Sequence, residues 1–192
     1  MNARLTLVAH ASTAATARAL FSRDEGLEPR GAAAAAAASA PRRITRAVCS
    51  PARAAVETAA ALGLATTVDA GLADWHLGEW RGRALDDVAA AHPGEVAAWL
   101  ADPDAVPHGG ESLTALLARV TGWLAGVGEG HTVAVTHAAV VRAAVVVTLG
   151  APPAGFWRID VAPLTATVLR GGPGRWTVRG TALPLDPSPG GR

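Results

Sequence analysis

The sequence alternates short apolar segments with stretches that favour helix, and this alternation limits the fold more than any other feature of the chain. The apolar segments of strand length are residues 5–9, 44–49, 66–69 and 132–136. Buried strands separated by helical segments pair in parallel, because each helix carries the chain back across one face of the sheet. The sequence therefore predicts an α/β fold with three layers, α/β/α, around a central and mostly parallel sheet.

The segments between and after these strands predict helices and one hairpin. Ser50 and Pro51 suit the N-cap and first residue of a helix that runs to Leu62, before Gly63. Apolar residues recur at helical spacing in residues 111–127, which predicts an amphipathic helix. Further helices are expected at residues 31–40, 84–91, 95–101 and 138–149, and a hairpin at residues 165–170 and 175–180.

Length and composition suit one ordinary domain. The chain has 192 residues, of which 50% are hydrophobic and 17% charged, so it can bury a core and differs from a disordered chain. We expect one domain over residues 1–185 and a disordered tail over residues 186–192. The net charge of +1 argues against nucleic-acid binding. With Cys49 as its one cysteine and no uninterrupted apolar run of about 18 residues, we expect a cytoplasmic protein with no membrane partner.

Polar residues follow three of the predicted strands. His10 comes directly after residues 5–9, Ser50 after residues 44–49 and His137 after residues 132–136. Ligands of such sheets bind beyond the carboxyl ends of the strands, so these residues would face one crevice. The alternative is that the two histidines are unrelated and each is satisfied by nearby backbone. Their convergence at one sheet edge favours a shared site.

The order of the motifs resembles the histidine phosphatase superfamily, which has the phosphoglycerate mutase-like fold. The resemblance covers about residues 5–180 and rests on five segments that follow one another in the family's order. They are LVAHAST at residues 7–13, SPARAAVETA at 50–59, LGEWRG at 77–82, GGESL at 109–113 and VAVTHAAVVR at 133–142.

The resemblance implies a phosphatase that works through a phosphohistidine. His10 would be the nucleophile, and His137 its partner, best protonated so that it can hydrogen-bond the transferring phosphoryl group. The family's acid falls in the loop that holds Asp74, while Glu111 is the other candidate for the acid or a residue near the pocket. The expected partner is a small phosphorylated substrate with an uncharged or partly apolar alcohol, and no cofactor or metal is implied.

Ala9 and Ala54 stand where the family has two arginines that bind phosphate. Losing two such donors without replacement would cost on the order of 10⁴ in rate. The candidates to hold phosphate in their place are Ser12, Thr13 and Arg53, together with the backbone N–H groups of the helix that starts near Pro51 and with Arg142 if it faces the crevice. Arg53 lies one residue from the family's position, and one step on a helix turns a side chain by about 100°.

The missing arginines leave two alternatives to a phosphatase. One is a repurposed enzyme in which the histidine pair and an acid perform acid–base chemistry on a substrate without phosphate. The other is a catalytically inactive relative that binds a ligand in the same pocket. The Ala-rich helices leave a homodimer contact open as well.

Overall fold

The computed structural model describes residues 3–172 and 174–187, and its centre is a six-stranded sheet in the order β3-β2-β4-β1-β5-β6. The first four of these strands pair in parallel, whereas β5 and β6 are antiparallel to their neighbours. The strands are β1 (Ala3–Ala9), β2 (Arg46–Cys49), β3 (Thr67–Val68), β4 (Gly130–Thr136), β5 (Thr165–Gly171) and β6 (Thr177–Pro184). The predicted α/β fold with a mostly parallel central sheet is confirmed, and so is the hairpin.

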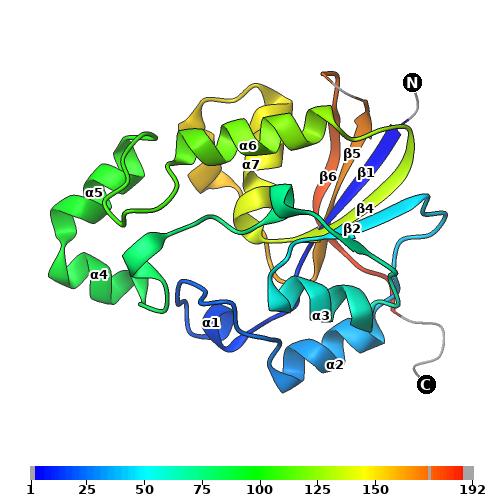
Figure 1. Cartoon of the computed structure of the whole chain (residues 1–192), viewed down its shortest axis with the longest axis horizontal. Coiled ribbons are helices and arrows are strands. Elements are labelled where there is room, and N and C mark those ends of the chain that lie inside the picture. The colour runs from blue at the N-terminus through cyan, green and yellow to red at the C-terminus, as the bar shows by residue number, and fades with distance from the viewer. Residues whose placement is uncertain (1–2, 173, 188–192) are drawn as a thin grey trace.

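Helices cover both faces of the sheet and form the three layers visible in Figure 1. They are α2 (Pro29–Ala37) and α3 (Arg53–Ala61) on one face, and α6 (Leu113–Ala125) and α7 (Ala138–Leu149) on the other. Side chains alternate between the two faces along β1, which explains this division. Leu5 and Leu7 belong to the larger core with α6 and α7, while Val8 belongs to the smaller core with α3.

An arm on the left of Figure 1 carries α4 (Leu85–Ala91) and α5 (Pro93–Ala101) away from the sheet. Trp99 of α5 anchors the arm, because its ring centroid lies 4.7 Å from that of Trp157, 5.2 Å from Trp75 and 5.3 Å from Trp80. Trp157 lies in a 3-10 helix, η3 (Pro153–Arg158), that the sequence pattern does not predict. The remaining short segments are α1 (Ala14–Ala17), η1 (Ala70–Leu72) and η2 (Gly78–Trp80).

α3 begins at Arg53, two residues after the start predicted at Pro51. Its N-cap is Ala52, which makes no side-chain capping bond. The hydroxyl of Ser50 accepts the N–H of Ala52 at 3.2 Å and also lies 2.8 Å from Nε2 of His137. The predicted cap is wrong because this contact across the sheet holds Ser50 outside the helix.

Asp186 and Pro187, the first two residues of the expected tail, contact Ser39. The backbone N–H of Ser39 donates to the carbonyl of Asp186 at 2.7 Å, and the hydroxyl of Ser39 donates to the carbonyl of Pro187 at 3.1 Å. Residues 188–192 of the expected tail lie outside the described residues. Within the described part of the chain, no helix is long and apolar enough to cross a membrane.

Candidate active site

Three strand ends meet at the carboxyl edge of the sheet and bring two histidines together. β1 and β4 are neighbours, and the backbone N–H of His10 donates to Thr136 at 2.8 Å. The ring centroids of His10 and His137 are 5.0 Å apart, and the ring planes cross at 71°. Ser50 joins them because its N–H donates to Val135 at 2.9 Å. Both histidines line one cavity, as their places after the two strands predict.

The hydrogen bond of His10 decides which of its nitrogens is free. Nδ1 lies 2.8 Å from the carbonyl oxygen of Ala11. A carbonyl only accepts, so the network assigns the proton to Nδ1. In the neutral ring, Nε2 then keeps its lone pair. The half-buried His10 thus presents the cavity with an oriented imidazole that has one nucleophilic nitrogen.

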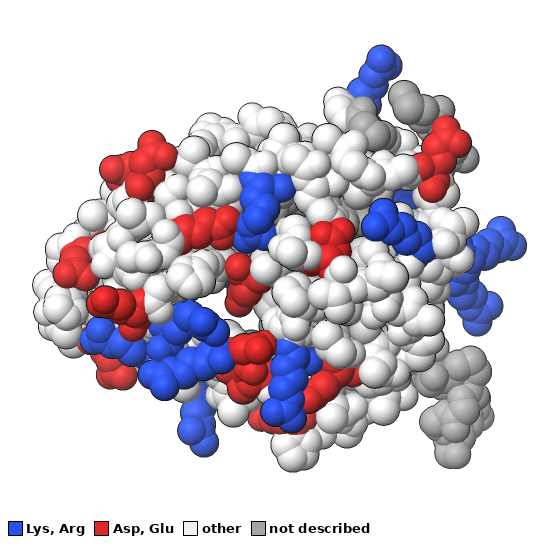
Figure 2. Space-filling view, in the orientation of Figure 1, with Lys and Arg blue, Asp and Glu red and all other residues white. Residues whose placement is uncertain are grey.

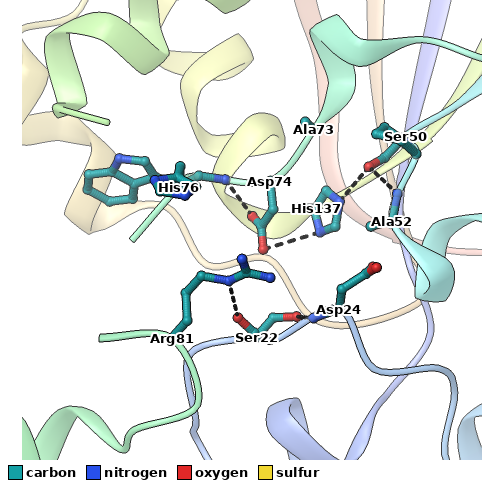
Figure 3. Close-up of a pocket in the computed structure, with 11 residues that line it drawn as sticks. Ser22, Asp24, Ser50, Ala52, Ala73, Asp74, His76, Arg81 and His137 are labelled. Atoms are coloured by element: carbon teal, nitrogen blue, oxygen red, sulfur yellow. Dashed lines mark hydrogen bonds and ion pairs between the residues drawn. The ribbon is translucent and has the colours of Figure 1, made fainter. Parts of the chain in front are cut away.

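His137 is buried, and two polar groups contact its ring, as Figure 3 shows. Nε2 lies 2.8 Å from Oγ of Ser50, and Nδ1 lies 3.4 Å from Oδ2 of Asp74. The O–H of Ser50 is free to donate to Nε2 while its oxygen accepts the N–H of Ala52, and the carboxylate of Asp74 on the other side of the ring favours the proton of His137 on Nδ1. Nδ1 makes no hydrogen bond within the described residues. A buried donor of this kind needs an acceptor, and a ligand in the cavity would supply it.

Burial lowers the pKa of His137 below its ordinary value, while the nearby charge of Asp74 acts in the opposite direction. Burial is the larger of the two effects. The family resemblance describes a protonated partner histidine, whereas burial in the ligand-free protein disfavours the protonated form of His137. A phosphoryl dianion beside the ring would raise the pKa again.

Asp74 faces the cavity from the loop between η1 and η2. Its Oδ1 accepts the N–H of Trp75 at 2.9 Å, and Oδ2 is directed toward His137. The side chain is 37% exposed, so one face of the carboxyl group is open to a ligand or water. The structure therefore brings His10, His137 and Asp74 together.

Glu111, the other candidate for the acid, lines neither of the cavities at this edge. Its carboxylate forms a two-point ion pair with Arg119, in which Nε and Nη2 each lie 2.9 Å from an oxygen. Arg119 also donates from Nη1 to the carbonyls of Gly71 and Ala73 at 2.9 and 3.0 Å. This carboxylate supports the loop of Asp74 and lines neither cavity, so of the two alternatives for Glu111 the structure favours a residue near the pocket over the acid.

The expected phosphate ligands are each engaged with a glutamate. The pairs are Ser12 Oγ with Glu28 at 2.7 Å, Thr13 Oγ1 with Glu25 at 3.1 Å and Arg53 Nε with Glu57 at 2.7 Å. Arg53 is 68% exposed and, like Ser12, lines neither cavity, while Thr13 borders the cavity of His10. In this structure Arg53 and Ser12 thus do not line the cavity as phosphate ligands would, and Arg53 pairs with Glu57, four residues along its own helix.

Arg81 is a cation at the cavity that the sequence reasoning missed. It follows η2 and faces Asp74 across the opening in Figure 3. Its Nε donates to the carbonyl of Ser22 at 3.3 Å, and no ion pair of its guanidinium exists among the described residues. The residue belongs to the quoted LGEWRG segment, but the direction of a loop side chain does not follow from a motif.

Two adjoining cavities of about 250 and 270 Å³ share Asp74, Arg81 and His137. Figure 2 shows the hollow between the arm and the body, with acidic and basic side chains on its rim. The larger cavity holds His10, and one part of its wall is aromatic. This part consists of Phe21, Trp75, Trp99, Phe156 and Trp157, and Arg142 also lines the cavity. In the described part of the chain, no three His, Cys, Asp or Glu side chains are grouped to hold a metal ion.

Comparison with known families and sequences points to phosphatases. The model of the histidine phosphatase superfamily (branch 1) matches residues 5–183. The chain is similar to a glucosyl-3-phosphoglycerate phosphatase of Mycolicibacterium vanbaalenii, with 35% identity over 136 residues, 63% of this chain and 60% of the relative. It is 41% identical over 76 residues to the protein of that name in Mycobacterium tuberculosis, 38% of this chain and 34% of the relative. The chain thus matches less than two thirds of the length of these curated relatives.

Solved structures match over nearly the whole chain. A structure titled mycobacterial hydrolase 1 superposes with a TM-score of 0.84 and 27% identity, covering 96% of this chain and 100% of the other. A mycobacterial glucosyl-3-phosphoglycerate phosphatase in complex with VO3 superposes with a TM-score of 0.82 and 29% identity, covering 94% and 98%.

Proposed function

Because this chain belongs to the histidine phosphatase superfamily, we propose that it hydrolyses a small phosphomonoester through a phosphohistidine formed on His10. The observation that carries the proposal is the pair of His10 and His137, whose rings meet in one cavity at the carboxyl edge of the sheet. Each ring offers the cavity a different group. Nε2 of His10 has a free lone pair, and Nδ1 of His137 is a buried donor without a partner in the described structure.

The reaction has two displacements at phosphorus. In the first, the lone pair of Nε2 of His10 forms the N–P bond while the bond between phosphorus and the leaving oxygen breaks, and Asp74 in its acid form protonates that oxygen. In the second, Asp74 takes a proton from water as the water oxygen bonds to phosphorus. The N–P bond breaks, its electron pair returns to Nε2, and phosphate leaves.

Ser50 is a positioning residue for this chemistry. It is fully buried, and its hydroxyl lies between the N–H of Ala52 and Nε2 of His137. By donating to Nε2 it keeps the proton of His137 on Nδ1, the nitrogen that faces the cavity and Asp74. This tautomer presents a hydrogen-bond donor to the phosphoryl oxygens, whereas the opposite tautomer would present a lone pair.

Arg81 supplies the positive charge that Ala9 and Ala54 lack. Both alanines are buried, at 3% and 5% exposure, and bring no polar group to the site. The guanidinium of Arg81 lines both cavities and has no carboxylate partner in the described structure. Its planar fork suits two phosphoryl oxygens at once. Thr13, at the border of the cavity, is a further donor once it leaves Glu25.

The larger cavity indicates what kind of alcohol leaves. Its aromatic wall suits an apolar face, such as a ring or the carbon face of a sugar, and Arg142 at the wall suits a carboxylate or further acceptor. The curated relatives are named glucosyl-3-phosphoglycerate phosphatases, so that compound belongs in a substrate panel with simpler aryl and sugar phosphates.

A second candidate is acid–base catalysis on a substrate without phosphate. The observation that favours it is the smaller cavity, in which Asp24 and Asp74 provide two carboxylates against the one guanidinium of Arg81. Vanadate and phosphate separate the two candidates. Both should inhibit a phosphatase competitively, and neither should affect a lyase or isomerase.

The decisive test is phosphate release from the panel between pH 5 and 8 by wild type, His10→Ala and His92→Ala. His92 is an exposed histidine on the arm that pairs with Glu95, so its variant is the matched control. We expect turnover to be lost only in His10→Ala, and a rapidly quenched wild-type reaction to contain protein heavier by one phosphoryl group. Equal turnover in wild type and His10→Ala, or no turnover of any ester by folded protein, would reject the proposal.

A further inference from the structure

A large cavity lies at the amino end of the sheet, on the side of α2 and α3. Its volume is about 630 Å³, and four arginines are among its lining residues, Arg4, Arg42, Arg43 and Arg170. Among the described residues, the one carboxylate of the lining is Asp186, and none of the four arginines forms an ion pair. Figure 2 shows basic side chains at the right-hand end of the molecule, beside the loop that leads into β2 in Figure 1. The cavity is therefore strongly positive.

The strand register places three basic groups side by side. Arg4 of β1 lies directly opposite Arg170 of the antiparallel β5 and is also paired in register with His131 of β4. Like charges directly opposite each other destabilise a sheet. Thr6 follows on the same face and lies 2.9 Å from Nε2 of His131 through its hydroxyl. The repulsion between these basic groups destabilises this face of the sheet, and a bound anion would reduce that repulsion.

Two further observations mark the cavity as unsatisfied. Nε of Arg4 is buried and has no hydrogen-bond partner in the described structure, an uncommon state for a charged group. Burial lowers the pKa of His131, and the charges of Arg4 and Arg170 act in the same direction, while hydrogen bonds to the backbone of Arg42 and Arg43 act in the opposite one. Arg42 also contacts the ring, because its carbonyl lies 3.1 Å from Nδ1.

The lining residues also limit the ligand. The volume is in the range that small-molecule sites use. Guanidinium groups bind phosphate and carboxylate groups through paired hydrogen bonds, and four of them exceed what a single monoanion needs. No Trp or Phe lines the cavity within the described residues, so a nucleobase would find no aromatic ring to stack on.

We propose that the cavity lined by Arg4, Arg42, Arg43 and Arg170 binds a small polyanion, a metabolite that carries two or more phosphate or carboxylate groups. The site is separate from the catalytic cavity. Arg4 is the second residue of β1, the strand that ends before His10, and six residues of strand span roughly 20 Å. The inference does not depend on the proposed phosphatase activity, because binding is measured without turnover.

The test is calorimetric titration with inorganic tripolyphosphate and, separately, citrate, using the full chain at low ionic strength. We compare wild type with Arg43→Gln/Arg170→Gln and with the matched double variant Arg30→Gln/Arg158→Gln, whose arginines are exposed and line other surfaces. We expect binding to wild type and the matched variant, and roughly tenfold or greater weakening in Arg43→Gln/Arg170→Gln. The variant Arg81→Gln should lose only the tripolyphosphate binding that belongs to the catalytic cavity, and should keep the binding that Arg43→Gln/Arg170→Gln weakens.

A second readout uses the ligand-free protein. Removing one of two facing arginines should leave the melting temperature of Arg43→Gln/Arg170→Gln equal to or above that of the matched variant at low salt. No heat of binding in wild type, equal affinity in Arg43→Gln/Arg170→Gln, or loss of all binding in Arg81→Gln alone would overturn the proposal. A marked fall in the melting temperature of ligand-free Arg43→Gln/Arg170→Gln would also overturn it.

Discussion

Arg81→Gln isolates the guanidinium that replaces two missing arginines in the proposed phosphatase site. The substitution keeps a long polar side chain and removes only the positive charge and the planar fork. Losing one preorganised donor to the charge of a transition state costs roughly 10²–10³ in rate. Arg81 is exposed and held by one hydrogen bond of 3.3 Å to Ser22, so solvent screens part of its effect. We therefore expect kcat/KM to fall about 10- to 100-fold.

The assay is hydrolysis of p-nitrophenyl phosphate at several salt concentrations, with inhibition by inorganic phosphate measured in parallel. If Arg81 contacts the phosphoryl group, the inhibition constant for phosphate rises in Arg81→Gln as well. The difference in kcat/KM between wild type and Arg81→Gln should then become smaller at high salt, because salt screens the attraction between Arg81 and the phosphoryl group. Stability should change by no more than about 0.5 kcal/mol, since Arg81 has no ion pair in the described structure.

Arg83→Gln is the matched control, because Arg83 follows two residues later in the same loop and lines neither catalytic cavity. It should keep wild-type kinetics and the wild-type inhibition constant. Full activity in Arg81→Gln would refute the reasoning, and so would an equal loss in Arg83→Gln, which would mean that the loop and not the guanidinium matters.

Three more substitutions or conditions test the site and its supports. Ser50→Ala should lower kcat about tenfold or more and alter its pH profile, because the tautomer of His137 is no longer held, while the protein stays folded; steady-state kinetics from pH 5 to 8 checks this. Glu111→Gln removes the ion-pair partner of Arg119, and the side chains of Arg119 and Glu111 are only 24% and 16% exposed. We therefore expect the free energy of unfolding, measured in urea, to fall by about 1–3 kcal/mol, and Glu95→Gln is the exposed control. Burial lowers the pKa values of His108, His131 and His137, so these groups bind protons more readily in the unfolded chain than in the folded one. Their contribution to the free energy of unfolding is fully present above about pH 6.5 and decreases as the pH drops below that value. Thermal unfolding between pH 8 and 5 measures this slope, which His108→Asn should reduce.

Backbone architecture was predictable from the sequence because it depends on short-range signals. Strand-length apolar runs separated by helical patterns set the order of the elements, and the parallel-sheet rule then places His10 and His137 at one edge. The amphipathic pattern of residues 111–127 became α6 (Leu113–Ala125), and only its ends moved. The helix start at Pro51 failed because a capping pattern is local, whereas Ser50 is engaged by His137, 87 residues away.

The polar residues of the site also divide into those that local sequence patterns predict and those that they do not. The two histidines follow from strand ends, where the backbone fixes the direction of the next side chain. Asp74, Glu111, Arg53 and Arg81 lie in loops or at the first residue of a helix, where a small change of backbone angle redirects a long side chain. Only the folded chain shows that Glu111 forms an ion pair with Arg119, and Arg53 with Glu57. Asp74 and Arg81, in contrast, face the cavity.

By itself, then, the sequence determined the α/β fold, the family and the convergence of two histidines, because periodicity and motif order are properties of neighbouring residues. Tertiary structure alone decided which carboxylate and which guanidinium reach the cavity of the two histidines. It also decided that Arg4 and Arg170, 166 residues apart in the sequence, stand opposite each other in the sheet. Such pairings depend on strand register and on the packing of distant segments, which no local pattern encodes.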